Sequence, residues 1–131
     1  MHFIRNARAA VTLTLLCSMS QIALAQKTVL LESVKQKEAQ AWDLAQQIWK
    51  FAEPGYQETK SSALLAGTLE AAGFEVRRGV ADIPTAFIAS YGAGKPVIAI
   101  LGEYDALPGL SQEAVPFRQP VKEGGYGHGC G

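Results

Sequence analysis

The stretch that decides the fold is Val97-Ile98-Ala99-Ile100-Leu101, an unbroken run of five apolar residues. A strand with one solvent-exposed face alternates between apolar and polar residues, whereas an unbroken apolar run indicates a strand that is buried on both faces. Strands of that kind lie at the centre of sheets that helices cover on both sides. The run therefore predicts an α/β fold with 97–101 as a central strand.

Two helices are predicted on the N-terminal side of this strand. Residues 34–52 carry apolar side chains at three- and four-residue spacing, and two of them, Trp42 and Trp49, are expected to be core anchors. A Pro-Gly pair then ends the helix. A second helix is expected over 58–72, with Gly73 in the position that follows its end.

Short strands are predicted at 74–76 and 85–91. The turn at 92–95 is too short for a crossover connection, so 85–91 and 97–101 should pair antiparallel. Other strand pairs need not be antiparallel, and the expected architecture is a helix pair packed on a mixed sheet. Prolines and glycines without periodicity indicate a long loop at 108–131, and loops of that length are often functional.

The composition is that of a globular protein, with 48% hydrophobic and 18% charged residues in a chain of 131. Twelve lysines and arginines balance twelve aspartates and glutamates, which argues against a nucleic-acid partner that is held by bulk charge. No apolar run of about 18 residues follows the N-terminal region, so we expect no membrane span in the mature protein.

Residues 1–25 have the organisation of a signal peptide: arginines near the start, a short apolar stretch, and an Ala-Leu-Ala cleavage site that ends at Ala25. We expect an exported protein, periplasmic or secreted, with 26–131 as its mature part. A short membrane anchor and a lipoprotein modified at Cys17 are the alternatives. Cleavage would leave Cys130 as the only thiol, which could be an intermolecular bridge, a liability or a metal ligand.

Residues that can carry chemistry follow the predicted central strand and recur near the C-terminus. Asp105 lies where a strand end borders the ligand crevice of an α/β sheet, so it could bind a metal, orient a ligand or cap a turn. For Glu103, two residues before Asp105, capping a turn is the favoured role. Cys130 and His128 offer a thiolate and an imidazole, which transition metals prefer, although His-x-Cys alone cannot complete a structural zinc site. The surrounding glycines leave the backbone free to fold tightly around an ion.

Taken together, four segments resemble the amidohydrolase branch of the binuclear metallopeptidases, a group related to the aminoacylases and carboxypeptidase G. Segment 102–112 contains Glu-Tyr-Asp-Ala-Leu-Pro, and segment 127–131 contains His-Gly-Cys-Gly. The other two segments are 53–56 and 73–76. The resemblance extends over residues 34–131. It implies that 26–131 is the N-terminal part of a metallopeptidase-like catalytic domain, truncated and inactive by itself.

The resemblance also implies roles for individual residues. Cys130 corresponds to a thiolate ligand of two divalent metal ions, manganese or zinc, and Asp105 to a catalytic aspartate near the site. Glu103 replaces the first aspartate of the family's pattern. His128 corresponds to a histidine that neighbours the metal pair and is not a ligand. The general base and the remaining ligands would follow Gly131.

The implied reaction is hydrolysis of an amide bond in a small molecule: an N-acyl amino acid, a p-aminobenzoyl-glutamate-like compound or a dipeptide. In such enzymes two metal ions lower the pKa of a bridging water and polarise the scissile carbonyl. The full-length protein is expected to be a homo- or hetero-oligomer. The alternative from another class is a small secreted module that binds a metal or has no catalytic function.

Overall fold

The computed structural model describes residues 26–129. They belong to two compact units, which are divided between Ala41 and Trp42. Among the described residues, no helix combines the length and the apolar character that a membrane crossing requires. The predicted signal peptide, residues 1–25, lies outside the described part of the chain.

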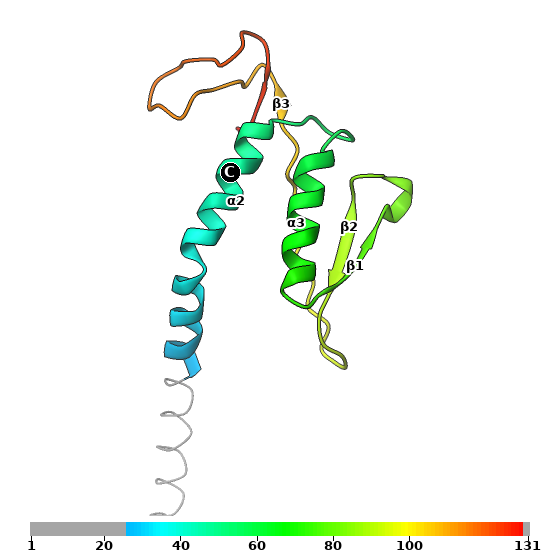
Figure 1. The fold of residues 1–131 in the computed structure, drawn as a ribbon. Helices are drawn as coiled ribbons and strands as arrows, with labels where there is room; N and C mark the ends of the chain where they lie inside the picture. The colour runs from blue at the N-terminus through cyan, green and yellow to red at the C-terminus, as the bar shows by residue number, and fades with distance from the viewer. Residues whose placement is uncertain (1–25, 130–131) are drawn as a thin grey trace, which may run out of the picture. The chain divides into compact units, whose positions relative to one another are not determined.

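The first predicted helix is present as α2 (Glu38–Phe51), and further helical residues, 26–36, precede it before a turn at Lys37 (Figure 1). No residue of α2 is buried, and Trp42 and Trp49 are 66% and 42% exposed. Their predicted role as core anchors is therefore wrong in the described structure. An apolar stripe is buried only where another layer packs on it, and the next helix and the strands pack on one another instead.

Two of the predicted strands are present and pair with each other. β1 (Glu75–Arg78) and β2 (Phe87–Ser90) are antiparallel, with Glu75 opposite Ser90. A short 3-10 turn, Val80–Asp82, connects them. The turn is entered through Gly79, whose φ of 67° lies in the left-handed region that favours glycine. The pair is thus a hairpin with a local connection.

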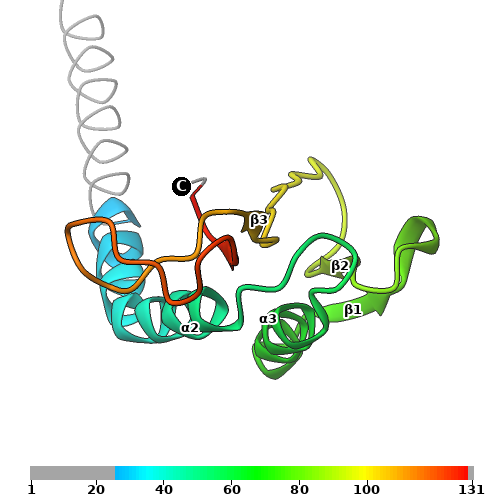
Figure 2. The same cartoon turned by 90° about the horizontal axis from the view of Figure 1, so that it is seen from above.

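The second predicted helix, α3 (Thr59–Ala71), packs against β1 and β2, as Figures 1 and 2 show. The predicted position of Gly73 after the end of this helix is confirmed. Gly73 has a φ of 91° and donates its N–H to the carbonyl of Glu70 (2.9 Å). The N–H of Phe74 donates to the carbonyl of Leu69 (3.0 Å), which completes a Schellman motif. The buried residues of α3 are small: Ser61, Ser62 and Ala66.

The predicted central strand is not formed. Residues 97–101 have no regular secondary structure, and their large side chains are 83–96% exposed. The expected antiparallel pairing of 85–91 with 97–101 is also wrong, because β2 pairs with β1. A strand buried on both faces requires a partner strand and a layer on each side. The described residues do not supply these around 97–101.

A second small sheet follows this segment. β3 (Leu107–Pro108) and β4 (Tyr126–Gly127) are antiparallel, and an isolated parallel bridge joins Pro54 to Ala106. The predicted loop at 108–131 is largely present but is interrupted by β4 within the described residues. The α/β class is confirmed: helices combine with small, mainly antiparallel sheets, as expected for part of a catalytic domain.

Candidate active site

Glu53 joins the end of α2 to the start of α3. Its carboxylate accepts hydrogen bonds from the amides of Lys60 (3.0 and 3.1 Å) and Ser61 (2.9 Å) and from the Ser61 hydroxyl (2.9 Å). The Thr59 hydroxyl adds a longer hydrogen bond of 3.3 Å. The first amides of a helix have no partner within the helix. Glu53 therefore supplies the side-chain cap that the N-cap residue, Glu58, does not provide.

The same contacts determine the charge of Glu53. Partial burial by itself would raise the pKa of this carboxyl group, but hydrogen bonds from Ser61, Lys60 and Thr59 together outweigh burial and hold the pKa below its ordinary value. The amino end of a helix also favours a negative charge. Glu53 is thus an ionised structural link between two helices.

The backbone of this link holds the chain next to the predicted catalytic residue. The amide of Ala106 donates to the carbonyl of Glu53 (2.8 Å), and Ala106 forms the parallel bridge with Pro54. Ala106 is 2% exposed and is one of two buried apolar residues in the described chain. The position directly after Asp105 is therefore fixed against the link between the helices.

Asp105 lies beside Gly55. A Cβ atom on Gly55 would be 3.9 Å from Asp105 Oδ2 and 4.0 Å from Glu58 Oε1, so two carboxylates border one backbone position. Asp105 is half-buried, and no described residue donates a hydrogen bond to its carboxylate. Glu103, by contrast, is exposed. Asp105 is thus the more buried member of this pair, and its catalytic role stays a prediction.

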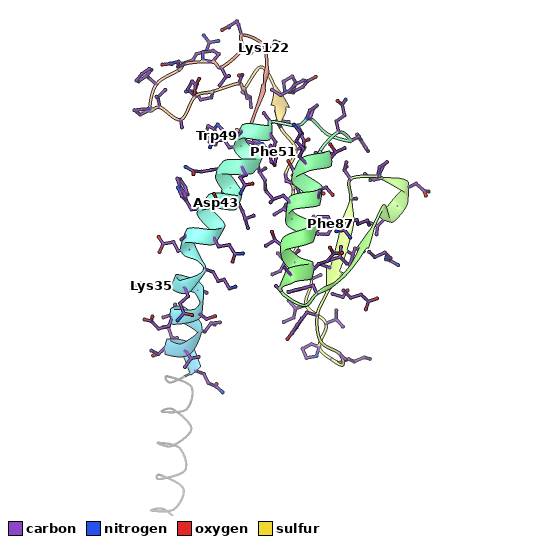
Figure 3. The ribbon with its side chains drawn as sticks, viewed as in Figure 1. Lys35, Asp43, Trp49, Phe51, Phe87 and Lys122 are labelled. Carbon is purple, nitrogen blue, oxygen red and sulfur yellow. The ribbon has the colours of Figure 1, made fainter. Side chains whose placement is uncertain are left out.

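A buried cluster around Thr85 places Tyr104, which directly precedes the predicted catalytic aspartate. The carbonyl of Thr85 accepts hydrogen bonds from the hydroxyls of Tyr104 (2.5 Å) and Ser62 (2.7 Å). The hydroxyl of Thr85 donates to Glu58 Oε2 (2.7 Å). The ring of Tyr104 also stacks on Phe87, which Figure 3 labels on β2, with centroids 6.2 Å apart. These contacts anchor the segment before the aspartate to α3 and β2.

The β3–β4 pair joins the segment before His128 to the segment after Asp105. Leu107 lies opposite Gly127, and Leu110 packs over both glycines that flank His128. A Cβ atom on Gly127 would collide with the carbonyl of Leu110, and one on Gly129 would lie 2.5 Å from Leu110 Cδ1. The backbone of Leu110 requires glycine at position 127, whereas at position 129 the Leu110 side chain could move aside. The sequence pattern did not reveal that reason, because it depends on a neighbour 17 and 19 positions away.

His128 reaches the C-terminal end of α2. Its Nε2 atom lies 3.1 Å from the carbonyl oxygen of Ile48. The same oxygen accepts the amide of Ala52 (3.2 Å) at the end of the helix. The segments that contain Asp105 and His128 are thus both tied to the chain between Ile48 and Gly55.

One side chain organises the loop between β3 and β4. The side-chain amide of Gln112 donates hydrogen bonds to the carbonyls of Glu113 (3.0 Å) and Phe117 (2.7 Å) and accepts one from the N–H of Gln119 (3.0 Å). The carbonyl of Gln112 in turn accepts the indole N–H of Trp49 (3.2 Å). Figure 3 labels Trp49 near the end of α2 and Lys122 in this loop. Trp49 therefore anchors the loop to α2.

The described residues do not complete a metal site by themselves. Within 26–129 no three His, Cys, Asp or Glu side chains gather closely enough to hold an ion. Cys130, the predicted ligand, lies outside the described residues. Carboxylate and thiolate are donor types that divalent ions accept, and Asp105 and Cys130 would supply them, whereas Nε2 of His128 is engaged by the carbonyl of Ile48. The predicted role of Cys130 stays a prediction.

The chain is similar in sequence to segments of several curated proteins. Over 91 residues the chain is 58% identical to a subunit of the p-aminobenzoyl-glutamate hydrolase of Escherichia coli K12, a match that covers 68% of this chain and 19% of the relative. It is 35% identical over 99 residues to thermostable carboxypeptidase 2 of Saccharolobus solfataricus, with 72% and 24% covered. It is also 35% identical over 108 residues to IAA-amino acid hydrolase ILR1-like 2 of Arabidopsis thaliana, with 80% and 24% covered.

The predicted resemblance is therefore confirmed: the chain is homologous to segments of an aminobenzoyl-glutamate hydrolase subunit, carboxypeptidases and an amino-acid-conjugate hydrolase. It spans between a fifth and a quarter of the length of these curated relatives. No family model matches the chain. No solved structure matches it either.

Proposed function

We propose that this chain forms part of a metal-dependent amidohydrolase that cleaves an amide bond in a small molecule. The candidate substrates are N-acyl amino acids, p-aminobenzoyl-glutamate-like compounds and dipeptides. The observation that carries the proposal is the 58% identity to a p-aminobenzoyl-glutamate hydrolase subunit. The structure supports it, because the Asp105 and His128 segments are both tied to the chain between Ile48 and Gly55.

In the proposed mechanism, Cys130 would hold one of two divalent ions, manganese or zinc. When bound, such ions make a water molecule acidic and polarise the scissile carbonyl. Asp105 would be the catalytic aspartate, and the hydrogen bonds of its neighbours Ala106 and Tyr104 hold its segment in place. The general base and the remaining ligands belong to residues outside 26–131.

The wider context of the enzyme is also a proposal. We propose that residues 1–25 are removed as a signal peptide and that the protein is periplasmic or secreted. Residues 26–131 would then be the N-terminal part of a catalytic domain, inactive alone. The word "subunit" in a relative's name supports an oligomeric full-length protein, homo- or hetero-oligomeric.

The test is amide hydrolysis by the complete natural protein that contains this chain, with p-aminobenzoyl-glutamate, N-acyl amino acids and dipeptides as substrates. We expect Asp105→Asn to lower kcat/KM by about 100-fold or more, the usual effect of losing a positioned carboxylate. Asp82→Asn is the matched control, because Asp82 is exposed and asparagine tolerates its φ of 60°. No hydrolysis of any of these substrates by the wild type would reject the proposed function, and unchanged kcat/KM in Asp105→Asn would reject the role of Asp105.

A further inference from the structure

The chain that leads to Asp105 is first held at Tyr104. Residues 91–103 form no helix or strand, and all of them are exposed. Tyr104 is the first half-buried residue after this segment, and Ala106, on the other side of the aspartate, is buried. The position of Asp105 therefore depends on what holds its two neighbours.

Tyr104 is held by two contacts of different kinds. Its hydroxyl donates to the carbonyl of Thr85 (2.5 Å), and its ring stacks on Phe87 with centroids 6.2 Å apart. Stacked rings attract each other over a range of centroid distances, whereas a hydrogen bond weakens steeply when its angle is distorted. The hydroxyl is therefore the contact that restricts Tyr104 to one place.

The acceptor of this hydrogen bond is itself fixed. Thr85 is buried, and its carbonyl accepts a second hydrogen bond from the hydroxyl of Ser62 in α3 (2.7 Å). The hydroxyl of Thr85 donates to Oε2 of Glu58, the residue before α3 (2.7 Å). Ser62 and Glu58 are buried as well. The phenol of Tyr104 is thus tied to the start of α3.

The same network returns to the surroundings of the aspartate. The second carboxylate oxygen of Glu58, Oε1, lies 4.0 Å from the place of a Cβ atom on Gly55, and Asp105 Oδ2 lies 3.9 Å from that place. Glu58 therefore contacts the residue that anchors Tyr104 and also borders the backbone position beside the Asp105 carboxylate.

We propose that Tyr104 is a positioning residue for Asp105 and that its hydroxyl, not its ring, has this role. By donating to the carbonyl of Thr85, the hydroxyl ties the aspartate to α3 and keeps the carboxylate beside Gly55. This inference rests on the proposed function, in which Asp105 is catalytic. The sequence pattern did not indicate the contact, because Thr85 is 19 positions away.

Steady-state kinetics of the complete natural protein test the proposal, with whichever of p-aminobenzoyl-glutamate, N-acyl amino acids and dipeptides the wild type cleaves. Tyr104→Phe removes the hydroxyl and keeps the ring on Phe87. We expect kcat to fall by about 10- to 100-fold, the effect of slightly misplacing a catalytic group, and KM to change by less than about twofold. Tyr91→Phe is the matched control: Tyr91 is exposed, its ring also lies against a phenylalanine, Phe74, and its hydroxyl has no hydrogen-bond partner among the described residues.

A double-mutant cycle with Asp105→Asn shows whether Tyr104 acts through the aspartate. If it does, Tyr104→Phe should not lower kcat further in the Asp105→Asn background, because no carboxylate remains to be positioned. Hydrogen–deuterium exchange adds a measurement that does not depend on turnover. The amide of Ala106, which donates to Glu53, should exchange faster in Tyr104→Phe but not in Tyr91→Phe.

The outcomes separate this inference from the function on which it rests. No hydrolysis by the wild type would reject the proposed function, and the positioning role would fall with it. In an active protein, unchanged kcat in Tyr104→Phe would overturn the positioning role alone. Losses of equal size in the wild-type and Asp105→Asn backgrounds would also overturn it, since the hydroxyl would then act by another route. Unchanged exchange of the Ala106 amide would show that the hydroxyl does not hold this segment, with the same consequence.

Discussion

At the scale of single residues, Glu53 has more structural partners than any residue that the sequence suggested as functional. Its carboxylate caps α3, and its backbone carbonyl binds the amide next to Asp105. The sequence marked this position as the end of a helix and as part of a segment that carries the resemblance, but not as a cap. A carboxylate six residues before the first residue of the next helix is not a standard capping pattern, so the cap depends on how the intervening turn folds.

We expect Glu53→Ala to lower the free energy of unfolding by about 1 kcal/mol, the usual cost of losing a helix cap. The measurement is denaturant unfolding at neutral pH. Glu123→Ala, which removes an exposed ion pair at 76% side-chain exposure, should change stability by less than about 0.5 kcal/mol. Equal effects in the two variants would contradict the capping role.

The lowered pKa of Glu53 also predicts how stability depends on pH. Because the folded-state pKa lies below the unfolded value, the unfolded chain binds more protons between the two. The contribution of Glu53 is thus present above the unfolded pKa and is lost as pH falls through the folded pKa. Glu53→Gln should flatten this acid limb in unfolding experiments, and a limb as steep as that of the wild type would contradict the assignment.

At the scale of elements, the β3–β4 pair connects the two motifs that carried the sequence resemblance. We expect Gly127→Ala to cost about 1–3 kcal/mol, because the new methyl group would collide with the Leu110 carbonyl and the backbone would have to shift. Gly102→Ala is the matched control, since Gly102 has no atom within 4 Å of the added Cβ and no positive φ. Thermal unfolding measures the difference, and similar melting temperatures in the two variants would contradict the packing.

Local sequence patterns predicted where helices and strands form better than they predicted which of them pair or pack together. The Pro-Gly break and Gly73 predicted where α2 and α3 end, because capping depends on neighbouring residues. The pairing of β2 with β1, and the exposure of Trp42, depend on which layers pack together, and hydrophobic spacing does not encode that. For the same reason the sequence suggested Asp105 and His128 separately, while the attachment of both segments to the chain between Ile48 and Gly55 became visible only in the structure.

At the scale of the whole molecule, the apolar run at 97–101 has no covering layer among the described residues. Its large side chains are 83–96% exposed, and contiguous apolar surface of this kind marks an interaction site. The curated relatives are about four to five times longer than the segments matched here. We infer that the remainder of a longer protein covers this run and completes the predicted central strand.

Hydrogen–deuterium exchange of the complete natural protein tests that inference. We expect the amides of 97–101 to be strongly protected, because strand pairing and burial both slow exchange. The exposed turn at 92–95 should exchange rapidly in the same sample and is the internal control. Exchange at 97–101 as fast as at 92–95 would show that the run stays uncovered.

The proposed function depends most on Cys130 as a ligand in a hydrolytic metal centre. The most direct measurement is the divalent metal content of the complete natural protein, purified without added metal, for the wild type and for Cys130→Ser. We predict bound manganese or zinc in the wild type and a strong loss in the variant, since serine is a much poorer ligand than a thiolate. Equal metal content in the two proteins would contradict the central claim.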